Sequence, residues 1–193
     1  SVDLHSGQIQ GFFDGPVDHL TAMPVLVEWM SNNLSGELVV VSPDAGRVKV
    51  AERYANLLHA NIAIVHKRRV RGVKNAVEAK DVVGEVEGKT CVLIDDMIDT
   101  GGTLVAAAEQ LAERGAASVY AAATHGVFSG PAIDRIKNSV LEKVVITNTL
   151  PLPPEKQIDK IEVLSAAGII ADAIDAVFED TSVSDIFDGQ NQH

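Results

Sequence analysis

The chain has 193 residues, 46% hydrophobic and 22% charged, which is the composition of an ordinary globular protein with one domain or slightly more. Its single cysteine, Cys91, excludes a scaffold built on internal disulfides, and no apolar run is long enough to cross a membrane. The 16 Lys and Arg against 27 Asp and Glu give a net charge of −11, which argues against nucleic acid as a partner. We therefore expect a soluble, cytoplasmic protein without a membrane partner.

Short apolar runs alternate with helical stretches along the chain. Runs rich in Val, Ile, Leu and Ala predict strands buried on both faces of a parallel sheet, at 38–42, 62–66, 90–95, 118–124, 143–148 and 161–164. Segments between and after them predict helices, at 24–32, 47–60, 103–114, 131–138 and 165–178. In the helix 103–114, one face carries Leu104, Ala107, Ala108 and Leu111, and Gly115 follows as the predicted cap. Strands that alternate with helices indicate an α/β fold with an open, doubly wound and mainly parallel sheet.

Three segments fall outside this alternation. Residues 1–5 have the pattern of a strand, and a start inside such a run, without an initiator Met, suggests a piece of a longer protein. Residues 66–81 are polar without apolar periodicity, which predicts a functional or mobile loop. The tail 179–193 is polar, and Val183, Ile186 and Phe187 are its candidates for packing.

The strongest functional signal lies in residues 90–104, where an apolar strand runs into acids, then glycines, then a helix. The residues of this turn are Asp95, Asp96, Asp99, Thr100, Gly101, Gly102 and Thr103. Ligands of parallel sheets bind beyond the carboxyl ends of the strands, where glycine N–H groups and a helix N-terminus favour an anion. We therefore predict that this turn binds a phosphate group.

The paired carboxylates predict a second ligand group beside the phosphate. Asp95 and Asp96 can accept hydrogen bonds from two neighbouring sugar hydroxyls, directly or through Mg²⁺. A phosphate next to a diol describes a ribose 5-phosphate unit. In the alternative interpretation, Asp99 or Thr100 caps the helix and the glycines form a tight turn, which accounts for one acid but not for three.

A cationic cluster follows the predicted strand 62–66. Its members are Lys67, Arg68, Arg69, Arg71 and Lys74, five of the 16 Lys and Arg. At the carboxyl end of a strand, these cations would neutralise charge that develops on a transferred phosphoryl or pyrophosphoryl group. Gly72 indicates a segment that can close as a lid. The alternative is a solvated loop whose charges serve solubility.

Two weaker motifs also place acids near strand ends. Asp3 and His5 end the first run and are candidate partners of Mg²⁺ or phosphate. Asp44 follows the strand 38–42 and is a candidate metal or substrate ligand. Taken alone, Asp44 is equally well explained as the N-cap of the helix 47–60.

The order of these motifs carries a resemblance to a known family. Residues 92–104 resemble the phosphoribosyl pyrophosphate loop of the type I phosphoribosyltransferase fold, and the chain through Phe187 is similar to the ribose-phosphate pyrophosphokinases. The motifs that follow in that family's order are Asp3-Leu-His5, Gln8-Ile-Gln-Gly-Phe-Phe13, Ser42-Pro-Asp-Ala-Gly46, Lys67-Arg-Arg69, 95–103 and Thr124-His-Gly-Val-Phe-Ser-Gly130. Ordinary phosphoribosyltransferases share the acidic turn but lack the other motifs.

The resemblance implies an activity and its partners. The family transfers the pyrophosphoryl group of ATP, its co-substrate, to the 1-hydroxyl of ribose 5-phosphate with Mg²⁺. The products are phosphoribosyl pyrophosphate and AMP, for nucleotide biosynthesis. The resemblance also implies a homo-oligomer, a hexamer, with phosphate or a nucleoside diphosphate as regulators near residues 124–130.

Roles for individual residues follow from the same resemblance. Lys67 and Arg69 match the catalytic positions, and His5 and Asp44 match the metal-associated positions. Asp95 and Asp96 would hold the ribose hydroxyls. The 5-phosphate would be held by Asp99, Thr100, Gly101, Gly102 and Thr103.

The chain departs from the family's pattern in three places. Arg47 stands where the family usually has a second glycine, and the basic loop continues as Val70-Arg71-Gly72-Val73-Lys74. The family's elements that grip the adenine of ATP do not occur. We interpret residues 1–18 as a remnant of the ATP-side domain, 19–180 as the phosphoribosyltransferase-like sugar-phosphate domain and 181–193 as a tail. We expect the chain alone to bind the sugar phosphate but to make little product.

Two other functions stay open. A phosphoribosyltransferase acting on a nucleobase would have no use for Lys67 and Arg69 in this arrangement. A non-catalytic, synthetase-associated regulatory subunit would have no need to keep these cations and the acidic turn.

Overall fold

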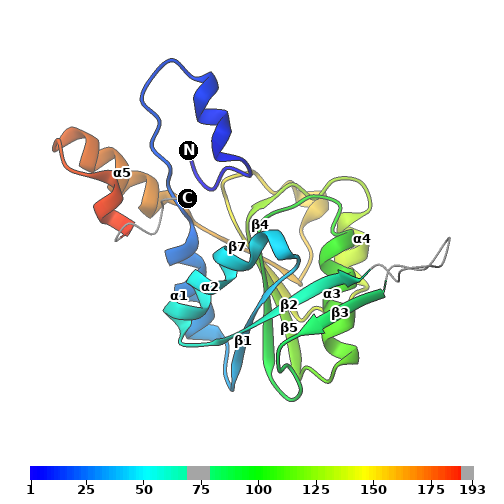
Figure 1. Cartoon of the computed structure of the whole chain (residues 1–193). Helices are drawn as coiled ribbons and strands as arrows, with labels where there is room; N and C mark the ends of the chain where they lie inside the picture. The colour runs from blue at the N-terminus through cyan, green and yellow to red at the C-terminus, as the bar shows by residue number, and fades with distance from the viewer. Residues whose placement is uncertain (69–78, 188–193) are drawn as a thin grey trace.

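Figure 1 shows an α/β architecture in the computed structural model, which describes residues 1–68 and 79–187. Within these ranges one sheet has the strand order β3-β2-β1-β4-β5-β6-β7. The strands are β1 (Leu38–Ser42), β2 (Asn61–Arg68), β3 (Ala79–Val83), β4 (Thr90–Ile98), β5 (Ser118–Gly126), β6 (Lys143–Thr147) and β7 (Ile161–Leu164). Neighbouring strands are parallel except β2 and β3. The predicted open, doubly wound and mainly parallel α/β sheet is therefore confirmed.

Helices cover both faces of this sheet. The α-helices are α1 (Met23–Asn33), α2 (Val48–Leu58), α3 (Gly102–Glu113), α4 (Ala132–Lys137) and α5 (Ala167–Phe178). The short 3-10 helices are η1 (Gly7–Phe12), η2 (Ala45–Arg47), η3 (Pro154–Lys156) and η4 (Val183–Phe187). Within the described part of the chain, no helix combines the length and the apolar character that crossing a membrane needs.

The alternation of side chains along the central strands explains the two layers. Val39 and Val41 of β1 pack with α3 and α4, whereas Val40 between them packs with α1 and α2. Because successive side chains of a strand point to opposite faces, a continuous apolar run supplies both cores. The fold class therefore follows from runs that are apolar without interruption.

Helix α3 follows directly on the glycine turn, as predicted from the sequence. Its predicted apolar face is buried, and Gly115 adopts the left-handed conformation after the helix with φ +84°. The N–H of Ala116 donates to the carbonyl of Leu111 at 3.0 Å, and that of Gly115 to Ala112 at 3.0 Å. This pair of bonds closes the end of the helix, so the predicted glycine cap is confirmed.

A third cluster lies beside the sheet rather than on it. Figure 1 shows α5 and η4 standing away from the strands, and they pack against Leu20 and Ala22 where the chain enters α1. Val183 and Phe187 are buried in this cluster. Ile186 is partly buried and packs against the same cluster, so packing of the tail through all three predicted residues is confirmed, while the division of the chain at residues 18 and 180 stays a prediction.

Two expectations about local structure were wrong. Residues 1–5 form only an isolated bridge, Val2 with Leu20, because the next residue, Asp3, has φ +39° and turns the chain. The stretch expected as one loop from 66 to 81 contributes strand at both ends, since β2 continues through Arg68 and β3 pairs antiparallel with it. β3 is an edge strand, where polar residues are tolerated, so it lacks the apolar signature of the buried strands.

The strand order reverses between β1 and β4. The chain moves from β1 outward to β2 and β3, then crosses back to β4 on the other side of β1 and continues outward to β7. At such a point the loops after the two central strands diverge to opposite faces and leave a crevice at their carboxyl ends. The segments after β1 and β4 carry Asp44 and the acidic turn, so topology brings these two motifs together.

Candidate functional site

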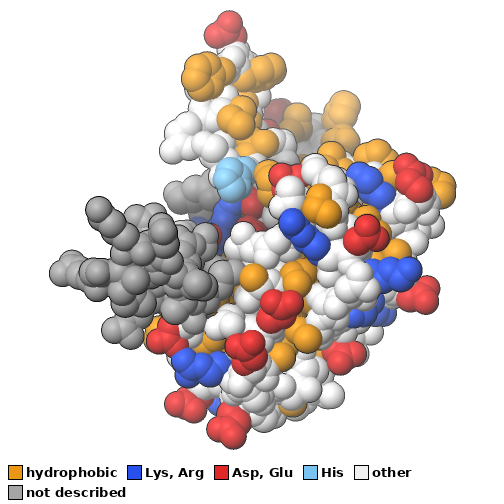
Figure 2. Space-filling view, turned by 90° about the vertical axis from the view of Figure 1, so that its right-hand side faces the viewer, with side chains coloured by type: hydrophobic (Ala, Val, Ile, Leu, Met, Phe, Trp, Pro, Cys, Tyr) orange, Lys and Arg blue, Asp and Glu red, His pale blue; other side chains and the backbone are white. Residues whose placement is uncertain are grey.

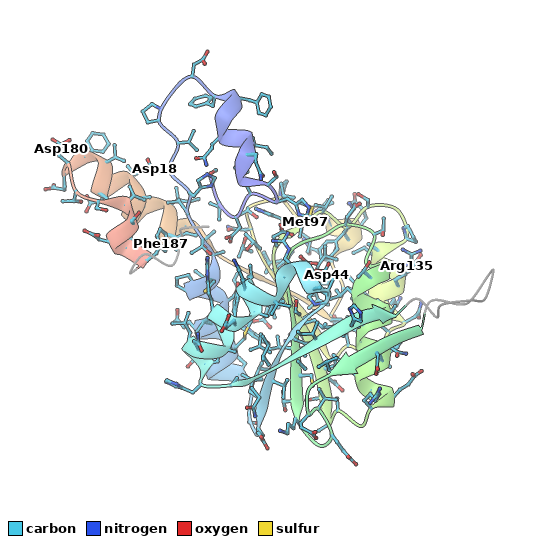
Figure 3. All side chains as sticks on the ribbon, in the orientation of Figure 1. Asp18, Asp44, Met97, Arg135, Asp180 and Phe187 are labelled. Atoms are coloured by element: carbon cyan, nitrogen blue, oxygen red, sulfur yellow. The ribbon has the colours of Figure 1, made fainter. Side chains whose placement is uncertain are left out.

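The site lies at the carboxyl end of the sheet, and Figure 3 shows Asp44, Met97 and Arg135 at that end, below the N-terminal segment. β1 pairs with β4 only as far as Val41 and Leu93. β4 continues beside β5 through Ile98, so it is longer than the predicted strand, which ended at Asp95. The acidic pair therefore stands on a rigid strand that extends past the end of its neighbour.

The two acids of the turn line two adjoining hollows on the protein surface. Asp95 and Asp96 both line a crevice with Arg47 and Tyr54, on the side of α1 and α2. Asp95 also lines a second hollow on the side of α3, formed by the glycine turn. Asp95 is thus shared between the carboxylate-lined crevice and the glycine turn.

All residues predicted to bind the phosphate are brought together in that second hollow. Its lining includes Asp99, Thr100, Gly101, Gly102 and Thr103. Gly101 has φ +69°, a conformation that glycine adopts without strain, and α3 begins at the next residue. The turn therefore places glycine backbone N–H groups at a helix N-terminus, an arrangement that favours an anion.

Arg135 of α4 adds a cation to this turn that the sequence did not reveal. Its Nη1 donates to the carbonyl of Thr100 at 2.9 Å and lies 3.1 Å from where a Cβ on Gly102 would stand. A Cβ at position 102 would therefore crowd the guanidinium of Arg135. The sequence gives little indication of this contact, because Arg135 is 35 residues from Thr100 and lies on a short helix with other charged residues.

Asp96 is the most buried charged group of the site, with 9% of its surface exposed. Its Oδ2 lies 2.8 Å from Nδ1 of His5 and accepts a hydrogen bond from Nη2 of Arg47. Its Oδ1 is buried and has no hydrogen-bond partner among the residues that the structure describes. A buried carboxylate oxygen without a partner is costly, so this atom marks a place for a ligand.

The neighbouring carboxyls have opposite electrostatic environments. Burial raises the pKa of Asp95 from its ordinary 3.8 to about 6, and the negative charge of Asp96 adds to this. Burial also disfavours ionised Asp96, but Arg47 and hydrogen bonds from Asp95 and His5 hold its pKa below the ordinary value. The pair thus combines a firmly ionised acid with one that takes up a proton in mildly acidic solution.

The N-terminal segment positions His5 beside these acids. Oδ2 of Asp3 accepts hydrogen bonds from the N–H of Ala22 at 2.8 Å and from the hydroxyl of Thr124 at 2.7 Å. Nε2 of His125 lies 3.0 Å from the carbonyl of Asp3 and is its donor, since a carbonyl only accepts. Thr124 and His125 at the end of β5 therefore anchor the segment that carries His5.

Beyond this anchor the segment projects from the body of the protein. Figure 2 shows hydrophobic side chains on the projection. Phe12 is 92% exposed and Phe13 is 65% exposed, and η1 has no buried residue. Apolar side chains at this exposure are typical of a surface that another protein segment covers.

Asp44 is a capping residue, as the alternative interpretation held, but it caps the 3-10 helix η2 and not α2, which begins at Val48. Its Oδ1 accepts from the N–H of Gly46 at 2.8 Å and of Arg47 at 3.2 Å. The described residues contain no cluster of three or more His, Cys, Asp or Glu side chains suited to a metal. The metal-associated roles of His5 and Asp44 stay predictions.

The acidic pair nevertheless fits Mg²⁺ as proteins usually bind it. This ion prefers oxygen ligands, keeps several waters and takes one or two carboxylates together with substrate phosphates, so a protein cage is not needed. The unpartnered Oδ1 of Asp96 and the adjacent carboxylate of Asp95 provide such oxygens. When bound there, the ion would neutralise negative charge on a phosphorylated substrate.

The two predicted catalytic cations are only partly placed. Lys67 lies in β2, where its backbone is in register with Lys80 of β3. Arg69 lies outside the described residues. β2 is the direct neighbour of β1, on the side of β1 that faces away from β4.

A comparison of the sequence with protein families decides the membership of the chain. Residues 71–188, more than half of the chain, match the phosphoribosyl synthetase-associated domain. The chain belongs to this family. Membership, the sheet topology and the structural relative described next together confirm the predicted type I phosphoribosyltransferase-like fold.

Relatives of the family cover nearly all of the chain. It is 57% identical over 191 residues to the ribose-phosphate pyrophosphokinase of Streptomyces avermitilis, covering 98% of the chain and 59% of that protein. For the enzyme of the same name from Bifidobacterium longum, identity is 53% over 197 residues, covering 100% and 58%. The crystal structure of phosphoribosylpyrophosphate synthetase from Mycobacterium smegmatis superposes with a TM-score of 0.83 at 49% identity, covering 93% and 58%. The chain thus spans less than two thirds of the length of these relatives.

Proposed function

We propose that the chain is the sugar-phosphate part of a ribose-phosphate pyrophosphokinase. Such an enzyme transfers the pyrophosphoryl group of ATP to the 1-hydroxyl of ribose 5-phosphate, giving phosphoribosyl pyrophosphate and AMP. The observation that carries the proposal is the position of Asp95, which lines both the glycine turn and the acidic crevice. One sugar phosphate can span two hollows that share a wall.

In this proposal the ligand is held at both ends. The 5-phosphate accepts hydrogen bonds from the turn 99–103, and Arg135 adds positive charge next to it. The sugar hydroxyls donate to Asp95 and Asp96, which only accept when ionised. Holding phosphate and diol together fixes the direction of the 1-hydroxyl, and this alignment lowers the barrier for attack on a phosphorus atom.

Lys67 and Arg69 complete the proposed reaction. Pyrophosphoryl transfer needs alignment and neutralisation of the charge that builds up on the transferred group, rather than covalent help from the protein. Cations from the hairpin of β2 and β3 would meet that charge opposite the acidic crevice. His5 and Asp44 would associate with Mg²⁺ and its waters next to the acidic pair.

The ATP side of the site is proposed to come from protein that precedes this domain. Residues 1–18 would be the last piece of that ATP-side domain, and the exposed Phe12 and Phe13 support this assignment. The complete enzyme would act in the cytoplasm as a hexamer. Phosphate or a nucleoside diphosphate would regulate it near residues 124–130, the stretch that anchors the N-terminal segment.

Calorimetry on the 193-residue chain tests the proposal directly. We expect ribose 5-phosphate to bind in the presence of Mg²⁺, and ribose without its phosphate to bind at least about tenfold more weakly, because the charged contacts of the turn are lost. Equal binding of the two sugars, or no binding of either, would overturn the assignment. The chain alone is expected to form little phosphoribosyl pyrophosphate from ATP.

A second experiment tests catalysis where both halves are present. In a protein that joins this chain to an ATP-side domain, Lys67→Ala is expected to lower turnover about a thousandfold or more, as removal of a charge-neutralising cation does in phosphoryl transfer. Binding of ribose 5-phosphate should be kept. Unchanged turnover would instead favour a regulatory role or a different transferase.

A further inference from the structure

Arg47 occupies the acidic crevice across the point where the strand order reverses. Its Nε lies 3.5 Å from Oδ1 of Asp95, and its Nη2 donates to Oδ2 of Asp96. The same Nη2 lies 2.9 Å from Nδ1 of His5. Only 21% of the Arg47 side chain is exposed. One guanidinium therefore contacts both carboxylates that line the crevice.

The backbone holds Arg47 in the right place for this contact. Oδ1 of Asp44 accepts from the N–H of Arg47, and the hydroxyl of Ser42 donates to the carbonyl of Asp44 at 2.5 Å. These bonds shape the turn at the end of β1, the strand directly beside β4. The capping turn thus directs a long cationic side chain from one central strand to the acids of the next.

A ligand held by both carboxylates meets Arg47 at Oδ1 of Asp95 and at Oδ2 of Asp96. Oδ2 of Asp96 is already shared by Arg47 and His5, which leaves the buried Oδ1 as the atom without a partner. Two ionised carboxylates carry a charge of −2, and the guanidinium reduces it to −1. A divalent cation binds more weakly to the smaller charge, because its attraction to a site scales with the site's charge.

We propose that Arg47 is a resident cation of the acidic pair, which Mg²⁺-loaded ribose 5-phosphate must displace, and which thereby sets the affinity of this site. The part that concerns the sugar rests on the proposed function. The part that concerns the cation depends only on the contacts of Arg47 with Asp95 and Asp96. Arg47 is accordingly a residue that determines affinity, and it takes no chemical part in transfer.

Calorimetry with ribose 5-phosphate and Mg²⁺ tests the proposal on the 193-residue chain. Arg47→Met keeps the length of the side chain and its backbone N–H but removes the charge. We expect it to bind the sugar phosphate about fivefold more tightly, the factor that a partly exposed ion pair is worth. Arg47→Lys keeps the charge and should bind nearly as the parent does. Equal or weaker binding by Arg47→Met would overturn the proposal.

A matched control removes an Arg–Asp ion pair elsewhere. Arg114 pairs with Asp81 just beyond the last residue of α3, whereas the glycine turn lies at its first residue. Twelve helical residues span about 18 Å, so Arg114→Met is expected to leave both ligand affinities unchanged. If Arg114→Met increased the affinity for ribose 5-phosphate as much as Arg47→Met, the cause would be the lower net charge of the protein and not the position of Arg47. That result would refute the proposal.

Two readouts separate this proposal from the assignment of function. Mn²⁺ replaces Mg²⁺ and its binding is followed by electron paramagnetic resonance without any sugar. We expect Arg47→Met to bind it more tightly, and failure of ribose 5-phosphate to bind either protein would count against the proposed function alone.

In the parent chain, the ¹⁵N resonance of the Arg47 Nε should shift when Mg²⁺ and ribose 5-phosphate are added. An unshifted resonance in a complex that has formed would refute displacement, whether or not the variants fold.

Discussion

Asparagine in place of Asp95 should make the protein more stable and its site weaker. The side chain of Asp95 is 31% exposed, and burial raises its pKa from 3.8 to about 6. Asparagine has the same shape, and its carbonyl oxygen can accept the N–H of Asp96 that Oδ1 of Asp95 accepts at 2.9 Å. The substitution therefore removes an unfavourable charge and keeps the local hydrogen bond.

The magnitude follows from linkage between protonation and folding. Each pKa unit corresponds to about 1.36 kcal/mol, so the ionised carboxyl lowers the free energy of unfolding by at most about 3 kcal/mol. Partial exposure and the ion pair with Arg47 reduce this, and we expect a gain of about 1.5 kcal/mol for Asp95→Asn at pH 8. For a chain of this size the melting temperature should rise by about 3 to 6 °C.

The gain should depend on pH in one direction. Between pH 3.8 and about 6 the folded chain keeps a proton on Asp95 that the unfolded chain has lost, so the parent loses stability as pH rises. Below that range the carboxyl is neutral in both states and the advantage of Asp95→Asn disappears. Chemical denaturation at pH 4 and pH 8 measures the difference.

A control and a refuting result complete the test. Asp159→Asn removes an exposed carboxylate outside the site and serves as the control for the loss of one negative charge. Asp95→Asn should also weaken binding of ribose 5-phosphate, which calorimetry follows. If Asp95→Asn is less stable than the parent at pH 8, or its advantage is the same at pH 4, burial does not destabilise the ionised carboxyl.

Three further predictions follow from the packing and the anchor of the N-terminal segment. A Cβ on Gly84, where φ is +123°, would lie 2.8 Å from Cβ and 2.9 Å from Cα of Ala63, so Gly84→Ala should cost about 1 to 3 kcal/mol in urea denaturation. Thr124→Val keeps the shape but removes the donor to Asp3, so it should cost about 1.5 kcal/mol or more. The same variant should weaken sugar binding in calorimetry by loosening His5, whereas unchanged affinity would separate the anchor from the site. Chelation of Mg²⁺ should weaken binding of ribose 5-phosphate in calorimetry, because the ion would neutralise negative charge between the acidic pair and the phosphorylated sugar.

Local patterns were sufficient for the central layers of the fold. The apolar runs that form β1, β4 and β5 are buried on both faces of the sheet. Such strands can be predicted from a few consecutive residues, because nearly all of their side chains are apolar. The turn 99–103 could also be predicted from consecutive residues, because glycines between a buried strand and a helix are typical of a phosphate-binding turn. Edge strand β3 was missed, since a strand with one open edge does not need an apolar run.

The sequence by itself determined which chemistry is present, and the tertiary structure decided which groups meet. Acids, hydroxyls and glycines stand within nine residues of each other, so their association required no knowledge of topology. Arg47 is 49 residues from Asp96, and Arg135 is 35 residues from Thr100. They reach the site only because β1 lies beside β4 and α4 packs against α3. The sequence shows Arg47 only as a departure from the family's glycine, whereas the fold places its guanidinium beside Asp95 and Asp96.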